Sequence, residues 1–504
     1  MTRQEQQNAF RLWNLIAGLV IGLTAVLSLP LIYGDLGGDR GFVNWFTIFI
    51  GAFFSGIFFW WLLIGRTRDA SVLRGVIAGA LSAILAYPIV FLLNELILRE
   101  VSAAVGLTTL PNRILHALTA AGLALLFGGW FTVLAGALIG GLLALVQKRV
   151  LPTIGDDMAD LVDAGTDRVS DFAHRRPVQA VIIGLILVLI VFILAAGSWV
   201  WFAPLATGGL HSEPEPVADY DAAVAATEAR QEQEALLNVN PACQTSLISH
   251  GQRTEKAIVY VHGFTNCPAQ FDQLGQEFFD LGYNVFVPRM PHHGLSDRLT
   301  DDLSHLTAEE LTAFADETMD IARGLGEEVT VVGLSGGGSV AGWIAQERQD
   351  VDNVVIIAPM FGILSLPPFS VKPLANAALT LPNLFMWWDP ATKEAIPGPD
   401  YAYPRYATEA AGNLLRLGRY VNEQAAEKPP AAGRIVAVTN AVDPAVNNEV
   451  FAEIVDRWRS AGFPVESYEF PAELNLPHDV VDPRQPDART ELVYPILIDL
   501  ITGS

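Results

Sequence analysis

The sequence predicts a bundle of about five transmembrane helices, followed by an α/β domain with a mostly parallel sheet. Long uncharged stretches fill residues 1–203, and each approaches the roughly 20 residues needed to cross a bilayer. After residue 240, short β-branched runs alternate with helical patterns, as in parallel sheets covered by helices. Within that part, one motif turns a strand sharply into a helix.

The apolar first part of the chain accounts for the predicted bundle. Its first stretch could instead be a cleaved signal peptide, but no small-x-small cleavage site follows and more apolar stretches do. Small residues four apart, as at Gly75 and Gly79, permit close helix packing within one bundle or in a homo-oligomer. The expected spans are Leu12–Tyr33, Phe42–Ile64, Leu73–Leu98, Ile114–Val146 and Val178–Phe202.

The distribution of charge indicates orientation and excludes some ligands. Basic residues concentrate in the connections after the second and fourth spans, which therefore face the cytoplasm. Five spans then make a multi-pass protein of the cell membrane with its last domain on the extracytoplasmic side; one span more or fewer would reverse this. The net charge is −23, and from Pro204 onward 18 Lys and Arg oppose 42 Asp and Glu. Such acidity argues against nucleic acid or anionic headgroups as ligands.

Residues 204–240 are expected to be an acidic linker with an exposed helix at Tyr220–Leu237. The α/β domain then covers 241–504. The alternation of strands and helices is interrupted at about 360–432. This stretch is proline-rich and aromatic, and we interpret it as a cap over the carboxyl end of the sheet. The expected strands are Ser246–Ser249, Ala257–Val261, Asn284–Val287, Val329–Val332, Val354–Ile357, Arg434–Thr439 and Val465–Phe470, and the helices between them are Ala269–Leu281, Ala308–Gly324, Ser339–Gln349 and Asn448–Ala461.

The cap stretch carries aromatic side chains suited to an apolar acyl chain. Part of it is expected to be ordinary core from two extra helices. The adjacent tryptophans indicate either an apolar wall or a surface that faces a membrane. The candidate acyl-binding residues are Phe361, Phe385, Trp387 and Trp388.

The strand-to-helix motif contains a candidate nucleophile. Ser335 follows an apolar strand and stands between Gly333 and Gly337, where a Cβ would collide with the neighbouring strand or helix. Acyl transfer by serine also needs a base, a carboxylate that orients the base, and donors for the oxyanion. Asp443 and His478 follow later strands in the chain order that such a fold requires.

Other residues near these motifs are expected to support the reaction or the local structure and not to act as nucleophile, base or orienting carboxylate. The backbone N–H groups of Gly336 and Phe264 are expected to form the oxyanion hole, with His262 fixing that loop. Asp479 is expected to be solvated or to cap a helix. The pair His292-His293 is interpreted as a turn, because no further ligands follow at a credible metal-site spacing, so neither metal nor cofactor is expected.

The chain has two cysteines, Cys243 and Cys267. In an extracytoplasmic domain they are expected to form one disulfide, the alternative being a pair of buried free thiols.

Three segments together resemble the α/β-hydrolase superfamily, and within it the bacterial carboxylesterases and monoacylglycerol lipases: His262–Thr265, Arg289–Asp297 and Gly333–Gly337. The resemblance spans roughly Gln244 to Leu500. Together with the expected spans, it implies a membrane-anchored serine hydrolase that cleaves carboxylic esters such as monoacylglycerols or lysolipids. A peptidase, thioesterase or acyltransferase with the same triad is an alternative, as is a membrane sensor or scaffold without turnover.

Overall fold

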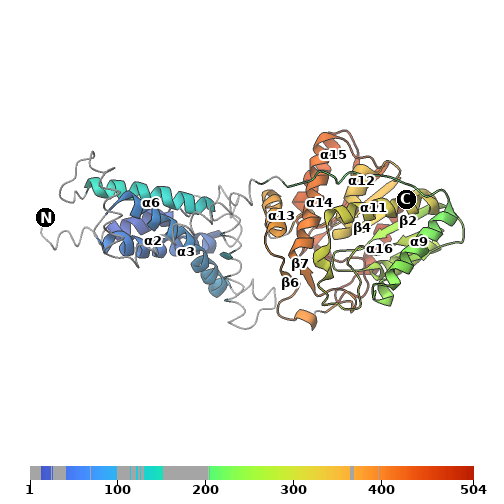
Figure 1. Cartoon of the computed structure of the whole chain (residues 1–504), viewed down its shortest axis with the longest axis horizontal. Coiled ribbons are helices and arrows are strands. Elements are labelled where there is room, and N and C mark those ends of the chain that lie inside the picture. Colours follow the sequence, from blue (N-terminus) through green and yellow to red (C-terminus); the bar gives the residue numbers. More distant parts are fainter. Residues whose placement is uncertain are drawn as a thin grey trace. The chain divides into compact units, whose positions relative to one another are not determined.

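The computed structural model of this chain divides into two compact units, Met1–Ala203 and Pro204–Ser504. Figure 1 shows the whole chain, coloured from the N-terminus to the C-terminus. The structure describes residues 13–23, 41–67, 70–98, 130–150, 205–363, 368–395 and 397–503, together with the isolated positions 25, 114, 118, 121, 122, 125 and 203.

The described part of the first unit is helical. α2 (Gly41–Trp60) continues into a π-helical turn, η1 (Trp61–Gly65), and packs against α3 (Val72–Leu98), which in turn packs against α6 (Trp130–Val150) (Figure 1). A shorter apolar helix covers Trp13–Leu23. A helix pairs its interior backbone N–H and C=O groups within the same segment, so apolar stretches such as these need no other partners for their backbone.

Glycines let these helices approach at backbone distance. A Cβ added at Gly79 of α3 would overlap the carbonyl of Gly136 in α6, and one added at Gly75 would overlap the carbonyl of Gly140. A Cβ at Gly18 would lie 2.5 Å from the Ile57 side chain. The small residues that the sequence singled out therefore serve packing within this unit.

Among the described residues, two helices are long and apolar enough to cross a membrane, Thr47–Gly65 and Val72–Leu93. They overlap the second and third expected spans. The apolar helices at Trp13–Leu23 and Thr132–Gln147 are shorter and overlap the first and fourth. The fifth, Val178–Phe202, lies outside the described residues. A five-span bundle therefore stays a prediction.

The second unit is built on a seven-stranded sheet in the order β1-β3-β2-β4-β5-β8-β9. Only β1 runs antiparallel to its neighbour; the other pairings are parallel. All seven predicted strands are present, as β1 (Ser246–Ile248), β2 (Thr254–Val261), β3 (Asn284–Val287), β4 (Gly326–Leu334), β5 (Asn353–Ile357), β8 (Arg434–Asn440) and β9 (Val465–Phe470).

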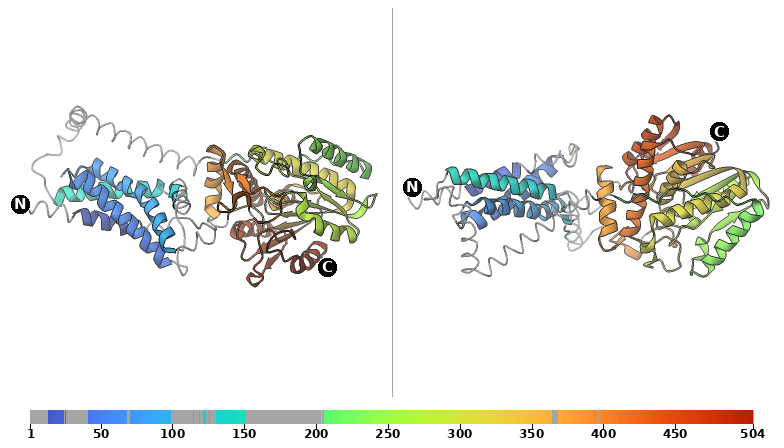
Figure 2. Two further views of the ribbon diagram at one scale, coloured as in Figure 1. Left: turned by 90° about the horizontal axis from the view of Figure 1, so that it is seen from below. Right: turned by 45° about the horizontal axis from the view of Figure 1, so that its top comes forward.

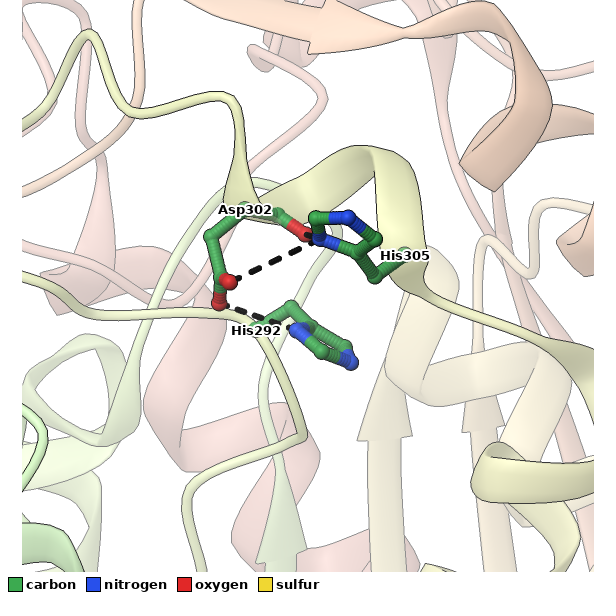
Figure 3. A group of neighbouring side chains, drawn as sticks. All are labelled: His292, Asp302 and His305. Atoms are coloured by element: carbon green, nitrogen blue, oxygen red, sulfur yellow. Dashed lines mark hydrogen bonds and ion pairs between the residues drawn. The ribbon is translucent and has the colours of Figure 1, made fainter.

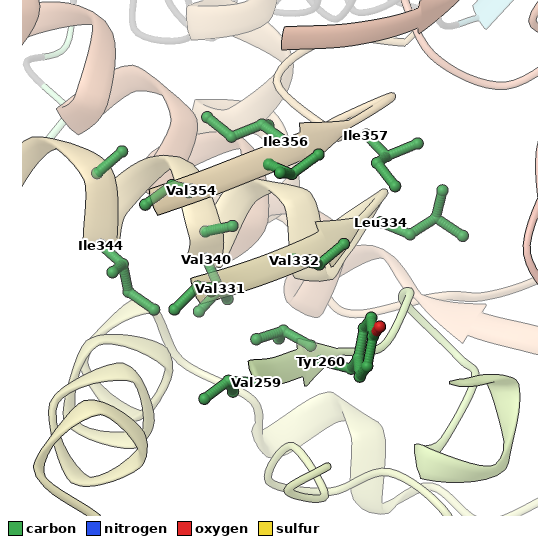
Figure 4. Close-up of a cluster of buried hydrophobic side chains, with 14 of the residues drawn as sticks. Val259, Tyr260, Val331, Val332, Leu334, Val340, Ile344, Val354, Ile356 and Ile357 are labelled. Carbon is green, nitrogen blue, oxygen red and sulfur yellow. The ribbon is translucent and has the colours of Figure 1, made fainter. Parts of the chain in front are cut away.

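Helices connect these strands and bury the apolar side chains of the sheet. The strands read as continuous β-branched runs because both faces of a parallel sheet are covered. In Figure 4, Val331 and Val332 of β4 lie between side chains of β2, β5 and the helix after β4. Figure 2 shows the helices beside the sheet. They are α9 (Tyr220–Ala235), α10 (Asp272–Asp280), α11 (Ala308–Leu325), α12 (Gly336–Glu347), α14 (Thr408–Glu427), α15 (Asn448–Ser460) and α16 (Thr490–Thr502).

Residues 205–240, expected as an acidic linker with an exposed helix, pack on this unit at a few positions. Leu210 is fully buried, and its carbonyl accepts a hydrogen bond from Trp343 Nε1 of α12 at 2.6 Å. α9 begins at Asp219, whose side chain caps the helix, and packs against α11. Glu234 at its end is buried and accepts hydrogen bonds from Thr245. The mostly polar composition of this segment gave no indication that Leu210 and Glu234 would be buried.

The cap stretch contains two kinds of structure. α14 packs against α12 and α15 and is therefore part of the core layer. α13 (Val371–Thr380) packs on α14 and is followed by the small antiparallel sheet of β6 (Phe385–Trp387) and β7 (Arg405–Ala407). The sequence prediction that part of this stretch is ordinary core is confirmed.

Candidate active site

The turn between β4 and α12 holds Ser335 in a conformation that few residues adopt. Its backbone has φ 57° and ψ −117°, outside the helical and extended regions. Its N–H donates to the Ile357 carbonyl at 3.0 Å, and its carbonyl accepts from Met360 N–H at 3.0 Å. A strained backbone fixed by its neighbours in this way is typical of functional residues.

The glycines on either side make this turn sterically feasible. A Cβ added at Gly333 would overlap the carbonyl of Gly337, and one added at Gly337 would overlap the carbonyl of Val261 in β2. The strand, the turn and the start of α12 are therefore in backbone contact. This agrees with the steric reason for which the sequence motif was singled out.

The loop after β2 meets the start of α12 at the position expected of an oxyanion hole. A Cβ on Gly336 would lie 2.9 Å from the backbone nitrogen of Phe264. In the described part of the chain, neither of these two N–H groups has a hydrogen-bond acceptor. Two free N–H groups beside the same serine are suited to bind an oxyanion.

Asp443 and His478 form a hydrogen-bonded pair at the same edge of the sheet. They follow β8 and β9, neighbouring parallel strands, whose carboxyl ends lie on one edge. Asp443 Oδ2 is 2.8 Å from His478 Nδ1. The other carboxylate oxygen, Oδ1, also accepts from the N–H groups of Ala445 and Val446. The carboxylate is therefore held against rotation and fixes the proton on Nδ1, which leaves Nε2 to act as a base.

The pKa values of this pair shift in opposite directions. Burial of the imidazole lowers the pKa of His478, but the hydrogen bond and charge of Asp443 outweigh it, and the pKa lies above its usual value. Burial raises the pKa of Asp443, yet its hydrogen bonds, that from His478 first, leave it below the usual value. The pair therefore stabilises the imidazolium that forms when His478 takes up a proton.

The structure brings Ser335 to the edge where this pair lies. Among the described residues, no hydrogen bond joins Ser335 to His478. Such catalytic contacts are often long without substrate and tighten in the complex.

Asp479 is buried, not solvated or at a helix cap as expected. Its Oδ2 accepts hydrogen bonds from Gln270 Nε2 at 2.8 Å and from Gln485 Nε2 at 2.9 Å. Gln270 Oε1 in turn accepts from Gly263 N–H at 2.7 Å. The loop that carries His478 is therefore linked through one amide side chain to the loop that carries Phe264. Sequence reasoning missed this link, because Gln270 and Asp479 lie far apart in the chain.

Two buried histidines support the same loops. His262 Nε2 accepts from Met290 N–H at 3.0 Å, so the ring fixes its loop as expected. His293 Nδ1 lies 2.7 Å from the Pro291 carbonyl. Burial lowers the pKa of His293 to about 3 and holds that of His262 well below its usual value. Both rings are therefore neutral structural groups.

The predicted disulfide is present. The Cα atoms of Cys243 and Cys267 are 5.2 Å apart, within the usual range for this bond. Cys267 directly precedes η5 (Pro268–Phe271) and follows the Phe264 loop. The bond therefore ties the segment before β1 to that loop.

The four aromatic residues proposed to bind an acyl chain lie in different surroundings. Phe361 is buried beside Phe451 and fills the space above Gly342 and Gly418, so it belongs to the core. Its position next to the cap stretch in sequence was misleading. Phe385 and Trp387 are partly buried in β6.

Trp388 is the cap residue that reaches the candidate site. Its Nε1 donates to Thr265 Oγ1 at 2.9 Å. The indole lies 4.4 Å from the Tyr406 ring and 6.3 Å from the Phe264 ring, centre to centre. An aromatic group formed by Phe264, Trp388 and Tyr406 thus adjoins the candidate oxyanion loop.

Comparison with known proteins agrees with this architecture. Residues 258–488 match the alpha/beta hydrolase family. A thermostable monoacylglycerol lipase of Bacillus sp. (strain H-257) is 24% identical over 176 residues, which cover 34% of this chain and 63% of that protein. The match therefore spans less than two thirds of that relative.

Two solved structures are also similar. One belongs to a study of LipS and LipT, two metagenome-derived lipolytic enzymes (18% identity, TM-score 0.42), and covers 53% of this chain and 100% of its own. The other is the monoacylglycerol lipase of Paleococcus ferrophilus (16% identity, TM-score 0.39), which covers 51% and 98%. The family match therefore assigns residues 258–488 of the second unit, and not the whole chain, to the alpha/beta hydrolase superfamily.

Proposed function

We propose that this protein is a membrane-anchored serine hydrolase that cleaves carboxylic esters through Ser335, His478 and Asp443. The observation that carries the proposal is the Asp443–His478 hydrogen bond of 2.8 Å. This pair lies at the carboxyl edge of the sheet, where Ser335 follows the end of β4. An imidazole with a fixed tautomer beside a strained serine is the arrangement that nucleophilic acyl transfer requires.

In the proposed reaction, Ser335 Oγ attacks the ester carbonyl carbon while His478 Nε2 takes the hydroxyl proton. The N–H groups of Phe264 and Gly336 stabilise the oxyanion that forms. The carbon–oxygen bond to the alcohol then breaks, and His478 returns its proton to the departing alkoxide. A water molecule, activated by the same imidazole, hydrolyses the acyl-enzyme and frees Ser335.

We propose monoacylglycerol- or lysolipid-like esters as substrates. The aromatic group of Phe264, Trp388 and Tyr406 offers apolar surface beside the oxyanion loop. The names of the relatives, monoacylglycerol lipases among them, point in the same direction.

The first unit would anchor the enzyme in the bilayer, and its helices could also join copies of the chain. The disulfide favours an oxidising, extracytoplasmic location for the second unit.

Labelling with a fluorophosphonate probe tests the nucleophile and the sidedness together. An impermeant probe applied to intact cells should modify the full-length chain on Ser335, as located by mass spectrometry, and should not modify Ser335→Ala. Labelling only after lysis would reverse the proposed orientation. Absence of labelling in both conditions would contradict the proposed nucleophile. A panel of ester, thioester and peptide substrates then identifies the bond that is cleaved.

A further inference from the structure

A second group of polar side chains lies between β3 and α11. His292, Asp302 and His305 each direct one nitrogen or oxygen to within 4.8 Å of the other two. Figure 3 shows the carboxylate of Asp302 between the two imidazoles. Asp302 and His305 belong to a short 3-10 helix, η6 (Asp302–His305). The proposed hydrolysis uses none of these side chains.

The distances in this group suit a small transition-metal ion. His292 Nδ1 lies 2.9 Å from Asp302 Oδ2, and His305 Nδ1 lies 3.7 Å from Asp302 Oδ1. His305 Nδ1 also lies 3.1 Å from the Asp302 carbonyl oxygen, a contact that metal binding would replace. In a tetrahedral zinc site with bonds of about 2.0–2.1 Å, neighbouring ligand atoms are roughly 3.3 Å apart. The two distances to the carboxylate lie on either side of that separation, so small side-chain rotations would complete the geometry.

The kind of ligands also favours zinc over magnesium or calcium. Two imidazoles and one carboxylate are ligands that zinc accepts, whereas magnesium and calcium prefer oxygen alone. His292 and Asp302 are partly buried, and His305 is 71% exposed. An ion can therefore enter from solvent, and a fourth position is open to water.

A second carboxylate orients the first imidazole. His292 Nε2 lies 3.2 Å from Glu310 Oε1. Glu310 is itself held at the start of α11, because its Oε2 accepts from the backbone and hydroxyl of Thr307. A histidine that binds metal through one nitrogen usually donates its other N–H to such a carboxylate. Glu310 therefore fixes the tautomer that presents Nδ1 of His292 as a ligand.

The backbone at His292 is also adapted to this arrangement. Its φ is 64°, in the left-handed region that residues other than glycine seldom occupy. The His292 carbonyl accepts from the Tyr403 hydroxyl at 3.3 Å, which helps to hold the turn.

We propose that His292, Asp302 and His305 bind one zinc-type divalent ion, with Glu310 as the positioning residue of His292. The ion would join the turn after β3 to η6. Arg405 of β7 is bonded to Asp301 and to the Leu299 carbonyl, immediately before η6. Metal binding would therefore stabilise the segment on which this cap strand rests.

Titration of the metal-free, full-length chain in detergent, without a histidine tag, tests this site. We expect about one zinc ion per chain by mass spectrometry. Cobalt(II) should give the visible absorption bands of a four-coordinate site with nitrogen and oxygen ligands, and zinc should abolish them. Zinc should also raise the melting temperature, because it binds only the folded state. Magnesium should do neither.

Substitutions distinguish specific binding at the proposed ligands from nonspecific binding to histidines on the surface. His305→Ala changes an exposed side chain and should fold, yet it should lose the cobalt spectrum and the thermal shift. Glu310→Gln should weaken binding roughly 10- to 100-fold. His250→Ala, a histidine stacked on Phe279 elsewhere, should bind as the parent does. Binding that survives both His292→Ala and His305→Ala, or no uptake by the parent chain, would overturn the proposal and leave a hydrogen-bonded histidine–carboxylate cluster.

Discussion

The carboxyl edge of the sheet and the cap differ in how their side chains are held. At the edge, Asp443 accepts from two backbone N–H groups and from His478, and Asp479 accepts from two glutamines. In the cap, Leu384 is 63% exposed and Trp388 is 41% exposed. One region is fixed by buried hydrogen bonds, and the other presents apolar surface.

This difference suggests a division of labour. The groups to which we assign bond breaking must be placed within fractions of an ångström, and they follow strands of one parallel sheet. Side chains that contact a variable acyl chain need no such precision. Substitutions at the edge should therefore lower turnover of every ester, whereas substitutions in the cap should alter preference among esters.

The largest effect is expected for Ser335→Ala. Without the nucleophile, turnover of p-nitrophenyl butyrate should fall by at least roughly 10³-fold and by as much as about 10⁶-fold. Ser460→Ala, at the end of α15, should leave the rate unchanged. Retention of most activity in the Ser335 variant would show that the carboxyl edge of the sheet is not the catalytic site.

Asp443→Asn should lower kcat roughly 10⁴-fold, because the imidazole loses its fixed tautomer. The same change alters the pH profile. In the parent enzyme the carboxylate raises the pKa of His478, and since the base must be neutral, activity falls as the pH drops through that raised value. Without the charge, the pKa falls and the acid limb of kcat/KM should move to lower pH. Asp456→Asn on the surface of α15 is the control; an unmoved acid limb in Asp443→Asn would contradict the pairing.

Much of this edge was predictable from sequence. Each parallel strand is a short apolar run, and parallel strands place their carboxyl ends together, so Ser335, Asp443 and His478 could be located by order alone. The link from Asp479 to Gln270 could not, because hydrogen bonds between distant loops leave no periodic signal.

The cap was harder to interpret for a related reason. Phe361 looked like part of the aromatic cap, but the absence of side chains at Gly342 and Gly418 creates the space that its ring occupies. Complementarity between a ring and two glycines on different helices depends on the tertiary fold. The metal-ligand candidates were missed likewise, since Asp302 lies ten residues beyond His292 in a separate turn.

Asp479→Asn tests whether the edge depends on that link. In the parent, Oδ2 accepts from both glutamines and Oδ1 accepts from the N–H groups of Val481 and Asp482, so the amide NH2 group deprives one of these two sets of its acceptor. The loops that carry His478 and Phe264 should therefore shift, and kcat should fall roughly 10- to 100-fold. The charge of Asp479 also raises the pKa of His478, but less than Asp443 does, so the acid limb of the pH profile should move to lower pH by less than in Asp443→Asn. Gln270→Ala should act through the same contact, so the double variant should lose less than the product of the two single losses. Independent, multiplicative losses would contradict a shared link.

The smallest effect is expected for Trp388→Ala in the cap. It removes one hydrogen bond to Thr265 and the indole surface that would contact a long acyl chain, a loss equivalent to about one or two buried CH2 groups at about 0.8 kcal/mol each. The ratio of kcat/KM for p-nitrophenyl decanoate to that for the acetate should therefore fall roughly three- to tenfold, with the kcat for acetate nearly unchanged. Leu381→Ala, an exposed apolar residue after α13, should leave the ratio as it is. If Trp388→Ala instead lowered turnover of both esters equally, the indole would be positioning the oxyanion loop through Thr265, and the cap would share in the chemistry that we assign to the edge.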